Sequence, residues 1–378
     1  MRIGWILALV LVTGLAESSI ITVGHDGFDY ASIQEGVNAA SPGDTIEINN
    51  GTYYESVNVN KSLILHGKGE ARVDASNNSE AINLSADKIV LSRLVVVNSS
   101  GWGIAIMPHY KDIIVKENVI TENAEYGIYL VVPFNTTITD NIISKNNEGI
   151  FGIGYCINIL NNNIVENKDV GIMCAFENST IMGNNLSLNN GTGIFLNTCA
   201  NTSIKSNIIA DNNDSGVELS YLCHNISLMD NIIYGHNSDA GISLGGMWDC
   251  SIIGNSIFDN RRGVFIDECG YVVVRGNTIK NNLGGVVISN ADNITIFNNN
   301  LDSNIYFAAL DDGHNEWDNG TIGNYYGDID CIDKDSNGIC DSEHKIPLNG
   351  TSVDRYPLAS WKPGSCPTMS RRLGIFYQ

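Results

Sequence analysis

Oxygen-bearing side chains alternate along a short segment near the C-terminal end of the sequence. They are Asp333, Asp335, Asn337 and Asp341. Alternate positions of a tight loop can point towards one ion, the carbonyl group of Ile339 supplies a further oxygen, and Gly338 permits the turn. The pattern predicts a calcium-binding loop of the EF-hand type, although His344 stands where a bidentate Glu is usual. An acidic, solvated turn is the alternative.

Two cysteines, Cys331 and Cys340, flank this loop, so a disulfide between them could hold it closed. Asp328, Asp330 and Glu343 are further carboxylates nearby, and any of them could supply the missing oxygen. We expect calcium to order the segment that contains the loop.

A second group of candidate residues is apolar. Large side chains occur two positions after a recurrent Gly in four successive repeats, namely Tyr129, Phe151, Met173 and Phe195. An exposed strip of this kind is typical of a binding surface, and sugars stack on aromatic faces. We therefore expect a polysaccharide, or a cell-surface glycan or protein, to contact this strip. A strip covered by loops such as Tyr155–Cys156, or by the C-terminal segment, is the alternative.

Carboxylates that could act on a polysaccharide follow the same repeat. Glu218 and Asp267 occupy outward positions two repeats apart, so we expect about 11–12 Å between their Cα atoms. Inverting hydrolysis places two carboxyls about 6.5–9.5 Å apart, which this pair fits poorly. Asp239, beside Asp214, could hold a cation, and Arg261 could face a uronate. A solvated ion pair between Asp239 and Arg261, worth under ~1 kcal/mol, is the alternative.

A repeat of 22 to 25 residues positions all of these side chains except the acidic loop. Each repeat contains a Gly followed by Ile or Val, and the glycines are Gly103, Gly127, Gly149, Gly171, Gly193, Gly216, Gly241, Gly263 and Gly285. The period is too short for a helical pair and fits one coil of a parallel β-solenoid. Apolar residues two positions apart indicate strands, whose apolar faces are buried only when coils stack. We expect roughly eleven coils and a length of ~50 Å.

A recurrent Asn marks a corner of each coil. The series is Asn118, Asn141, Asn163, Asn184, Asn207, Asn231, Asn255, Asn277 and Asn299. Asn tolerates the left-handed conformation of a bend, and stacked amides can bond the Asn above and below. Many asparagines lie in Asn-x-Ser/Thr sequences. We interpret the series as a corner ladder and keep Asn135 and Asn319, which lie outside it, as candidate glycan acceptors.

The ends of a solenoid need covers. Ser32–Glu35 has the pattern of a capping box, which predicts a short helix over the first coil that ends at Pro42-Gly43. We expect residues 20–305 to form the β-helix with this cap. Residues 306–360 are then a C-terminal cap that contains the calcium-type loop, and residues 361–378 are a tail.

The N-terminal residues predict export. Arg2 precedes an apolar run, and Ala16 is small at the right offset, so residues 1–16 resemble a signal peptide. An uncleaved anchor is the alternative, although the run is short for a span of about 20 residues. We expect no membrane span after cleavage. Lys and Arg number 21 against 42 Asp and Glu, and this net charge of −21 argues against a nucleic-acid partner.

Cysteines recur within the repeats. Cys199 and Cys223 occupy equivalent positions of adjacent coils, and Cys269 lies two coils after Cys223. We interpret them as small buried apolar side chains. A disulfide, which export permits, or a soft-metal site is the alternative.

Several short motifs point to a known family. They are Gly323-Asn-Tyr-Tyr326, the acidic loop from Asp333 to Asp341, Lys345-Ile-Pro347 and Asp354-Arg-Tyr-Pro-Leu358, with Tyr30–Gln34, Gly43–Ile46 and Gly51–Glu55 near the other end. Over residues 20–358 the chain resembles NosD-like β-helix proteins of archaea, in the pectin-lyase-like superfamily with its CASH repeats. Tyr326 stands where many relatives have Trp, and the cysteine pair is an addition. The resemblance implies a right-handed parallel β-helix on a secreted or surface protein.

The name of that group implies copper delivery during maturation of nitrous-oxide reductase. The His residues of this chain lack a spacing such as His-x-x-x-His, and only Cys199 and Cys223, with His224, offer soft ligands for Cu(I). We therefore do not expect copper. The opening segment also resembles pectin methylesterases, but their catalytic stretches are missing.

These observations predict an all-β chain that forms a single-stranded right-handed parallel β-helix. The expected function is that of a secreted or cell-surface binding or scaffold protein that contacts carbohydrate and is stabilised by calcium. A lyase, hydrolase or epimerase acting on an acidic glycan is the first alternative. A periplasmic copper-handling accessory protein is the second.

Overall fold

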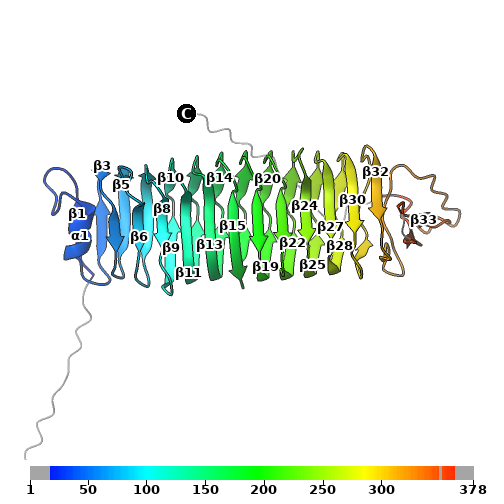
Figure 1. The fold of residues 1–378 in the computed structure, drawn as a ribbon, viewed down its shortest axis with the longest axis horizontal. Helices are drawn as coiled ribbons and strands as arrows, with labels where there is room; N and C mark the ends of the chain where they lie inside the picture. Colours follow the sequence, from blue (N-terminus) through cyan, green and yellow to red (C-terminus); the bar gives the residue numbers. More distant parts are fainter. Residues whose placement is uncertain (1–17, 349–350, 362–378) are drawn as a thin grey trace, which may run out of the picture.

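The computed structural model describes residues 18–348 and 351–361. The chain winds into one elongated stack of parallel strands (Figure 1). The predicted all-β, right-handed parallel β-helix is confirmed. The predicted signal peptide at residues 1–16, and the predicted tail from residue 362 onward, lie outside the described residues. Among the described residues, no helix combines the length and the apolar character that crossing a bilayer requires.

One face of the stack runs through the greatest number of coils. Its strands are β1 (Ile20–Val23), β2 (Thr45–Ile48), β5 (Ile64–Asp74), β7 (Val90–Val97), β9 (Lys111–Lys116), β11 (Tyr126–Thr139), β13 (Glu148–Leu160), β16 (Thr180–Met182), β19 (Ala200–Lys205), β22 (His224–Met229), β25 (Trp248–Ile253), β28 (Gly270–Arg275) and β31 (Thr295–Phe297). These are 13 strands, so the prediction of roughly eleven coils was too low.

The second face contains short strands. They are β3 (Gly51–Tyr54), the ends of β5 and β7, β10 (Val119–Thr121), β12 (Ile142–Ser144), β14 (Asn163–Val165), β17 (Asn185–Ser187), β20 (Ile208–Ala210), β23 (Ile232–Tyr234), β26 (Ser256–Phe258) and β29 (Thr278–Lys280).

The third face follows the repeat glycines and is called the groove face below. Its strands are β4 (Val57–Val59), β6 (Glu80–Leu84), β8 (Trp102–Ile106), the first halves of β11 and β13, β15 (Ile172–Glu177), β18 (Ile194–Asn197), β21 (Val217–Ser220), β24 (Ala240–Gly245), β27 (Arg262–Asp267), β30 (Gly284–Ser289) and β32 (Phe307–Asp311). β32 continues the stack beyond residue 305, where the prediction ended the β-helix.

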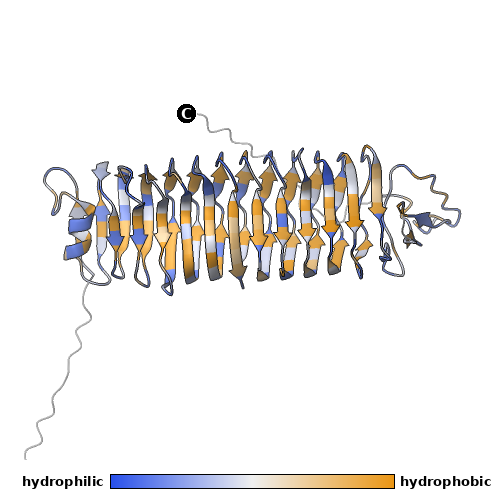
Figure 2. Cartoon of the chain, viewed as in Figure 1, coloured by the Kyte–Doolittle hydropathy of each residue, from blue (hydrophilic) through white to orange (hydrophobic). Residues whose placement is uncertain are grey.

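Apolar residues alternate with polar ones along the strands (Figure 2). The inward columns stack with the same residue type in coil after coil; Ile128, Ile150 and Ile172, for example, are register partners and fully buried. The interior is therefore one continuous apolar column, as the repeat predicts.

Two ladders of buried amides follow the corners. The first is Asn118, Asn141, Asn162, Asn184, Asn207, Asn231, Asn255, Asn277, Asn299 and Asn324. In each step one Asn donates its backbone N–H and its Nδ2 to the Oδ1 of the next Asn. The prediction placed Asn163 in this series, and that choice was wrong. Asn162 is the ladder residue. The buried apolar residue of each coil lies two positions after the ladder Asn, and Ile164, not Val165, is the buried register partner of Ile143.

The second ladder was not predicted. It comprises Asn123, Asn146, Asn167, Asn189 and Asn212 on one side of His236, and Asn260, Asn282 and Asn304 on the other. Repeat glycines lie beside it: a Cβ at Gly127 would come within 2.8 Å of Asn146 Nδ2 and 2.7 Å of the carbonyl oxygen of Gly149. The repeat Gly is needed because the bend leaves no room for a side chain.

Helix α1 (Ile33–Ala39) lies against the first coil. Ser32 is its N-cap and accepts a hydrogen bond from the backbone N–H of Glu35 at 3.1 Å. Glu55, from the next turn of chain, accepts the backbone N–H groups of Ile33 at 2.7 Å and Gln34 at 3.0 Å. Together the two side chains satisfy three N–H groups that a helix start leaves without partners.

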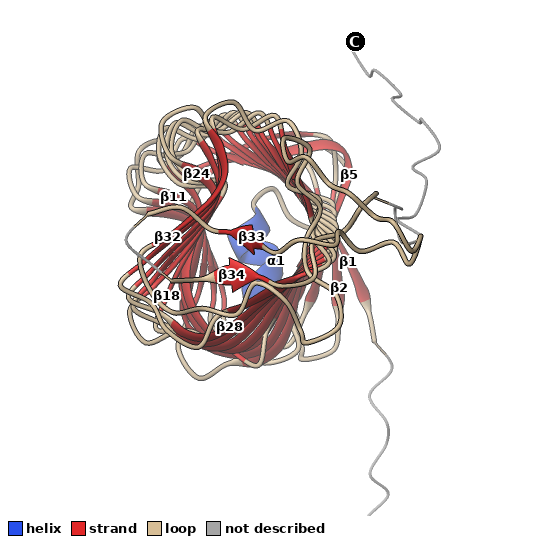
Figure 3. Ribbon diagram, turned by 90° about the vertical axis from the view of Figure 1, so that its right-hand side faces the viewer, coloured by secondary structure: helices blue, strands red, loops and turns tan. Residues whose placement is uncertain are grey.

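The opposite end of the stack carries the C-terminal segment. Its hairpin, β33 (His344–Lys345) and β34 (Val353–Asp354), lies over the interior of the tube when viewed from that end (Figure 3). Buried Asp354 accepts the backbone N–H of Asn324 at 2.7 Å, so a carboxylate ends the first Asn ladder. Gly323 must be Gly, because a Cβ there would lie 1.8 Å from Asp354 Oδ1.

Candidate functional site

A surface groove of about 330 Å³ follows β11, β13, β15 and β18 on the groove face. The four residues predicted to form a strip line it: Tyr129, Phe151, Met173 and Phe195. They are register partners in four successive coils and are half-buried. The groove is also lined by the next outward residues of these strands, Val131, Ile153, Ala175 and Asn197. The C-terminal segment lies at the far end of the stack and not over this strip (Figure 1).

Backbone irregularity shapes the groove. Gly152 has φ +139°, and a Cβ there would lie 2.1 Å from the carbonyl oxygen of Leu130, so no other residue fits without a shift. The pairing of β11 with β13 also changes register between Val131 and Phe134. Such bulges bend a strand, and here the bend lies beside the groove.

Two aromatic residues that the prediction missed support the strip. Tyr126 stacks on Phe151 with ring centroids 4.4 Å apart, and Trp102 contacts Tyr129 at 4.5 Å. The indole Nε1 of Trp102 donates to Glu125 Oε2 at 3.1 Å. Packing of this kind holds the Tyr129 and Phe151 rings in fixed orientations, which lowers the entropy cost of stacking a ligand on them.

Glu148, also missed by the prediction, lies beside this aromatic cluster. It immediately precedes Gly149 and is the register partner of Tyr126. Its Oε2 atom is buried and has no hydrogen-bond partner among the described residues. Burial, with smaller effects of Asp169 and Glu125, raises the pKa of Glu148 to about 7. A proton can therefore enter or leave this carboxyl near neutral pH.

The predicted carboxyl pair is not brought together. Glu218 is the register partner of Phe195 and so lies at the end of the strip, where burial, with Asp214 and Asp239, raises its pKa. Asp267 is the register partner of Gly245. It therefore lies two coils beyond Glu218 and two positions further along the strand. The register reproduces the offset of two coils and two positions from which the separation was predicted, so the pair fits a hydrolytic spacing poorly.

Asp239 has a different partner from the predicted one. Its carboxylate pairs with Arg262 and accepts a hydrogen bond from Ser215 Oγ at 2.9 Å. Arg261, the predicted partner, instead donates to the carbonyl oxygen of Ser238 at 3.0 Å. The Arg262 guanidinium lies 4.0 Å above the Phe265 ring. Arg262 precedes Gly263 at the bend, and from there its side chain reaches both groups.

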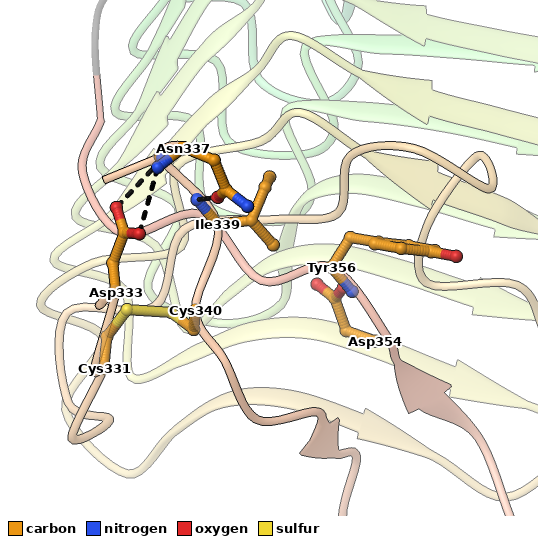
Figure 4. The surroundings of a disulfide bond; sticks show 8 residues. Cys331, Asp333, Asn337, Ile339, Cys340, Asp354 and Tyr356 are labelled. Atoms are coloured by element: carbon orange, nitrogen blue, oxygen red, sulfur yellow. Dashed lines mark hydrogen bonds between the residues drawn. A yellow bond between two sulfur atoms is a disulfide. The ribbon is translucent and has the colours of Figure 1, made fainter. Parts of the chain in front are cut away.

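The acidic loop is folded as a tight turn beside a disulfide (Figure 4). Asp333 accepts the backbone N–H groups of Asn337 at 3.1 Å and Gly338 at 2.9 Å. Ligand oxygens of Asp333, Asp335 and Asp341 all lie within 4.8 Å of one another. The other predicted side-chain ligand, Asn337, turns its Oδ1 to the backbone N–H of Ile339 at 2.7 Å.

The two cysteines that flank the loop form a disulfide. Cys331 and Cys340 have an S–S distance of 2.05 Å and Cα atoms 5.2 Å apart. Cys340 also donates its backbone N–H to the carbonyl oxygen of Pro357 at 2.8 Å, which attaches the loop to the end of the C-terminal segment. Asp328, Asp330 and Glu343 are not part of the three-carboxylate group.

The two thiols predicted as soft donors lie in the core. Cys199 and Cys223 are fully buried free thiols, and the backbone N–H of Cys199 donates to Cys223 Sγ at 3.3 Å. His224 is exposed, with its Nδ1 3.2 Å from the carbonyl oxygen of Leu222. Hence His224 does not join the two thiols, and the buried-side-chain interpretation describes them well.

Comparison with known proteins identifies a family model and several solved structures. The model described as periplasmic copper-binding protein (NosD) matches residues 21–189, 151–235 and 189–331. No curated protein matches the chain.

The A-module of the mannuronan C-5 epimerase AlgE6 from Azotobacter vinelandii has a TM-score of 0.65 at 17% identity, covering 73% of this chain and 89% of that one. The AlgE4 A-module of the same organism has a TM-score of 0.63 at 17% identity, covering 70% and 88%. XylC in complex with xylose has a TM-score of 0.61 at 10% identity, covering 83% and 88%. At these identities the similarity shows the shared β-helix fold alone.

The group of three converging carboxylates does not fit copper. Cu(I) prefers thiolate, thioether and imidazole ligands. Among the described residues, the one group in which three or more His, Cys, Asp or Glu ligand atoms converge is Asp333, Asp335 and Asp341, which offers oxygen alone. Oxygen donors suit calcium or magnesium. The family description and the donor chemistry of this part of the chain therefore disagree.

Proposed function

The chain belongs to the NosD family, and from its groove we propose that it is an extracytoplasmic β-helix protein that binds polysaccharide chains. The single observation that carries the proposal is the groove beside Tyr129, Phe151, Met173 and Phe195. Four large side chains at one-coil intervals form a linear surface, and a polymer of sugar rings is a linear ligand with apolar faces. The description of the family as periplasmic, and the predicted signal peptide, support the location.

Binding is better supported than catalysis. Hydrolysis needs two carboxyls at a defined separation, and Glu218 and Asp267 are too far apart in the register. Asp239 is engaged by Arg262, and Arg261 donates to a backbone carbonyl. Lyase, hydrolase and epimerase activity is therefore not the function that this geometry favours. Copper handling is favoured still less, because the one group of three or more converging His, Cys, Asp or Glu ligand atoms in the described residues contains no soft donor.

Calcium is the second part of the proposal. Three carboxylates that crowd one point repel each other, and a divalent cation with oxygen preference would relieve that repulsion. The loop adjoins the end of the stack, so a bound ion would stabilise the cap and not the groove. The carbonyl of Ile339 and the side chain of Asn337 are the remaining predicted ligands.

The binding proposal is tested with a double substitution. Phe151→Ala with Phe195→Ala removes two of the four stacking faces, and we expect retention on immobilised polysaccharides to fall by about tenfold or more, since each stacked face contributes on the order of 1 kcal/mol. Tyr234→Ala with Phe258→Ala is the matched control, because that stacked pair lies on the second face of the β-helix. Its retention should match the wild type.

Two outcomes contradict the proposal. Equal retention of the groove variant and the wild type would show that the groove is not the binding site. Retention of the wild type on an alkyl matrix and on no polysaccharide would assign the groove to an apolar ligand instead.

A further inference from the structure

The residues that line the groove include no cationic side chain. All thirteen are apolar, aromatic or uncharged polar residues, and the polar ones are Asn197 and Thr198. A site that binds an acidic polymer usually presents Arg or Lys to each carboxylate, because an unpaired anion against a half-buried apolar surface loses its hydration without compensation. This groove offers no such compensation.

Carboxylates border the groove instead. Glu148 lies beside the Tyr126–Phe151 stack, with Glu125 in the preceding coil and Asp169 in the following coil close enough to raise its pKa. Glu218 extends the column that contains Phe195 and lies at the end of the strip. One end of the aromatic strip, beyond Phe195, and one flank, beside Phe151, are therefore acidic. An anionic ligand laid along the strip would meet like charge at that end and along that flank.

The nearest cations lie elsewhere or are engaged. Lys111 is a register partner of Phe134, beyond the bulge and outside the groove lining. Arg262, which pairs with Asp239, lies four coils beyond the coil of Met173. Lys145 and Lys168 line a different surface hollow, which also contains acidic residues.

We propose that the groove selects polysaccharide chains that carry no acidic groups and rejects polyuronates. The inference rests on the proposed function and names its substrate class: the aromatic strip supplies stacking, and the carboxylates of Glu218 and of ionised Glu148 repel acidic groups. The epimerases that share this fold are named for mannuronan, which is an acidic polymer, so the inference separates this chain from what those names imply.

The test compares polymers that share a backbone and differ chiefly in charge, at pH 8.5, where Glu148 with its pKa of about 7 is ionised. Affinity gel electrophoresis is run with hydroxyethyl cellulose against carboxymethyl cellulose, and with methyl-esterified against de-esterified homogalacturonan. We expect retardation by the neutral member of at least one pair and an affinity for its acidic partner that is lower by about tenfold or more at low salt. The difference in affinity between the neutral and the acidic polymer should narrow as ionic strength rises, because salt screens the repulsion.

Charge-removing variants place the effect in the groove. Glu148→Gln with Glu218→Gln should raise the affinity for the acidic polymer relative to the neutral one by about threefold to tenfold. Glu122→Gln with Glu166→Gln, in the other surface hollow, is the control of equal charge change and should leave this ratio unaltered.

Each outcome has one meaning. An acidic polymer that retards the protein as strongly as its neutral partner overturns the inference and leaves glycan binding intact. A ratio that shifts equally in both double variants assigns the selectivity to net charge and overturns the inference too. Retardation by none of the four polymers counts against the proposed function itself.

Discussion

At the scale of single residues, the groove combines predicted and unpredicted side chains. Tyr129, Phe151, Met173 and Phe195 could be found because they follow the repeat Gly at a constant offset of two. Trp102, Tyr126 and Glu148 were missed, although they also occupy a constant position, immediately before the Gly. The alternation rule fails there, because the chain bends at the Gly and the preceding side chain turns outward.

Glu148 gives a prediction about pH. Its pKa is raised to about 7 in the folded state from an ordinary value near 4.5, so the folded state binds the proton more tightly than the unfolded chain. Stability from this group is therefore present below about pH 4.5 and is lost as pH rises through about 7. Glu148→Gln removes the titrating group. We expect the Tm difference between variant and wild type to grow from pH 4.5 to pH 7.5 and then stay constant.

Differential scanning fluorimetry at a series of pH values measures this difference. Exposed Glu122→Gln serves as the control and should give a Tm difference that does not change over the same interval. A Tm difference for Glu148→Gln that is flat with pH would show that the carboxyl has no unusual proton affinity in the folded chain.

At the scale of elements, the corner ladders decide how coils are held together. The first ladder could be predicted from the sequence, apart from the choice between Asn162 and Asn163, which a run of three asparagines leaves ambiguous. The second ladder was recoverable too, because each of its residues follows a first-ladder Asn by five positions. His236 hides the regularity, since it stands at that position between Asn212 and Asn260.

His236 is a defect in the second ladder. Its ring nitrogens lie 3.3 Å from the carbonyl oxygens of Asn212 and Ile209, and a neutral imidazole can donate to one of them alone. His236→Asn would supply a side-chain oxygen for the backbone N–H of Asn212, as Asn212 does for Asn189. We expect a gain of about 1 kcal/mol and a rise in Tm of about 1–3 °C.

The gain from His236→Asn should depend on pH. Burial lowers the pKa of His236 below 6.5, so the unfolded chain takes up the proton first as pH falls, and the wild type loses stability there. The Tm difference should therefore widen from pH 7 to pH 5. Asn282→His, which places the same defect in an intact step, is the reverse control. A lower Tm for His236→Asn would contradict the prediction.

Asp354 ends the first ladder, and its loss should loosen the last coil. It accepts the backbone N–H of Asn324 at 2.7 Å, the hydroxyl of Tyr326 at 3.2 Å and the backbone N–H of Tyr356 at 3.0 Å. Asp354→Ala leaves three donors without this acceptor, at a cost of about 1–3 kcal/mol for each buried group left unsatisfied. Amide hydrogen exchange should accelerate in residues 295–326 and stay slow in central coils.

Exposed Asp259→Asn is a suitable comparison, because it also removes a carboxylate from the chain and Asn tolerates the φ of +56° at this position. Its exchange rates should match the wild type throughout. Uniform acceleration along the whole stack in Asp354→Ala would mean that the coils open as one unit, and the capping role would then be wrong.

At the scale of the whole molecule, the repeat specified the architecture and the irregular ends limited the prediction. The stack of 13 strands exceeds the expected number because the coils before Gly103 lack the repeat Gly and contain long strands such as β5, which crosses two faces. The end cover resisted prediction for a related reason. Its contacts, such as Asp354 with Asn324, join residues that no periodicity relates.

Calcium removal tests how that end is held. The Asp333 loop is attached to the stack through the backbone bond from Cys340 to Pro357 and the bond from Leu358 to Asn324, so ordering of the loop reaches the last coil. We expect calcium at a hundredfold excess over Kd to stabilise the C-terminal segment by about 2.7 kcal/mol, which calorimetry detects as a higher Tm. Chelator should reverse the change.

Asp335→Asn with Asp341→Asn separates ion binding from loop geometry. The amides keep the size of the side chains and remove two of three crowded charges. In chelator, this variant should be at least as stable as the wild type, because the repulsion between the carboxylates is gone. In calcium, the wild type alone should gain stability and should then melt at the higher temperature of the two. An equal calcium response in both proteins would place the ion elsewhere. If calcium changes the Tm of neither protein, the loop is an acidic turn held by the disulfide. Contacts within the protein alone would then cover the last strands of the stack.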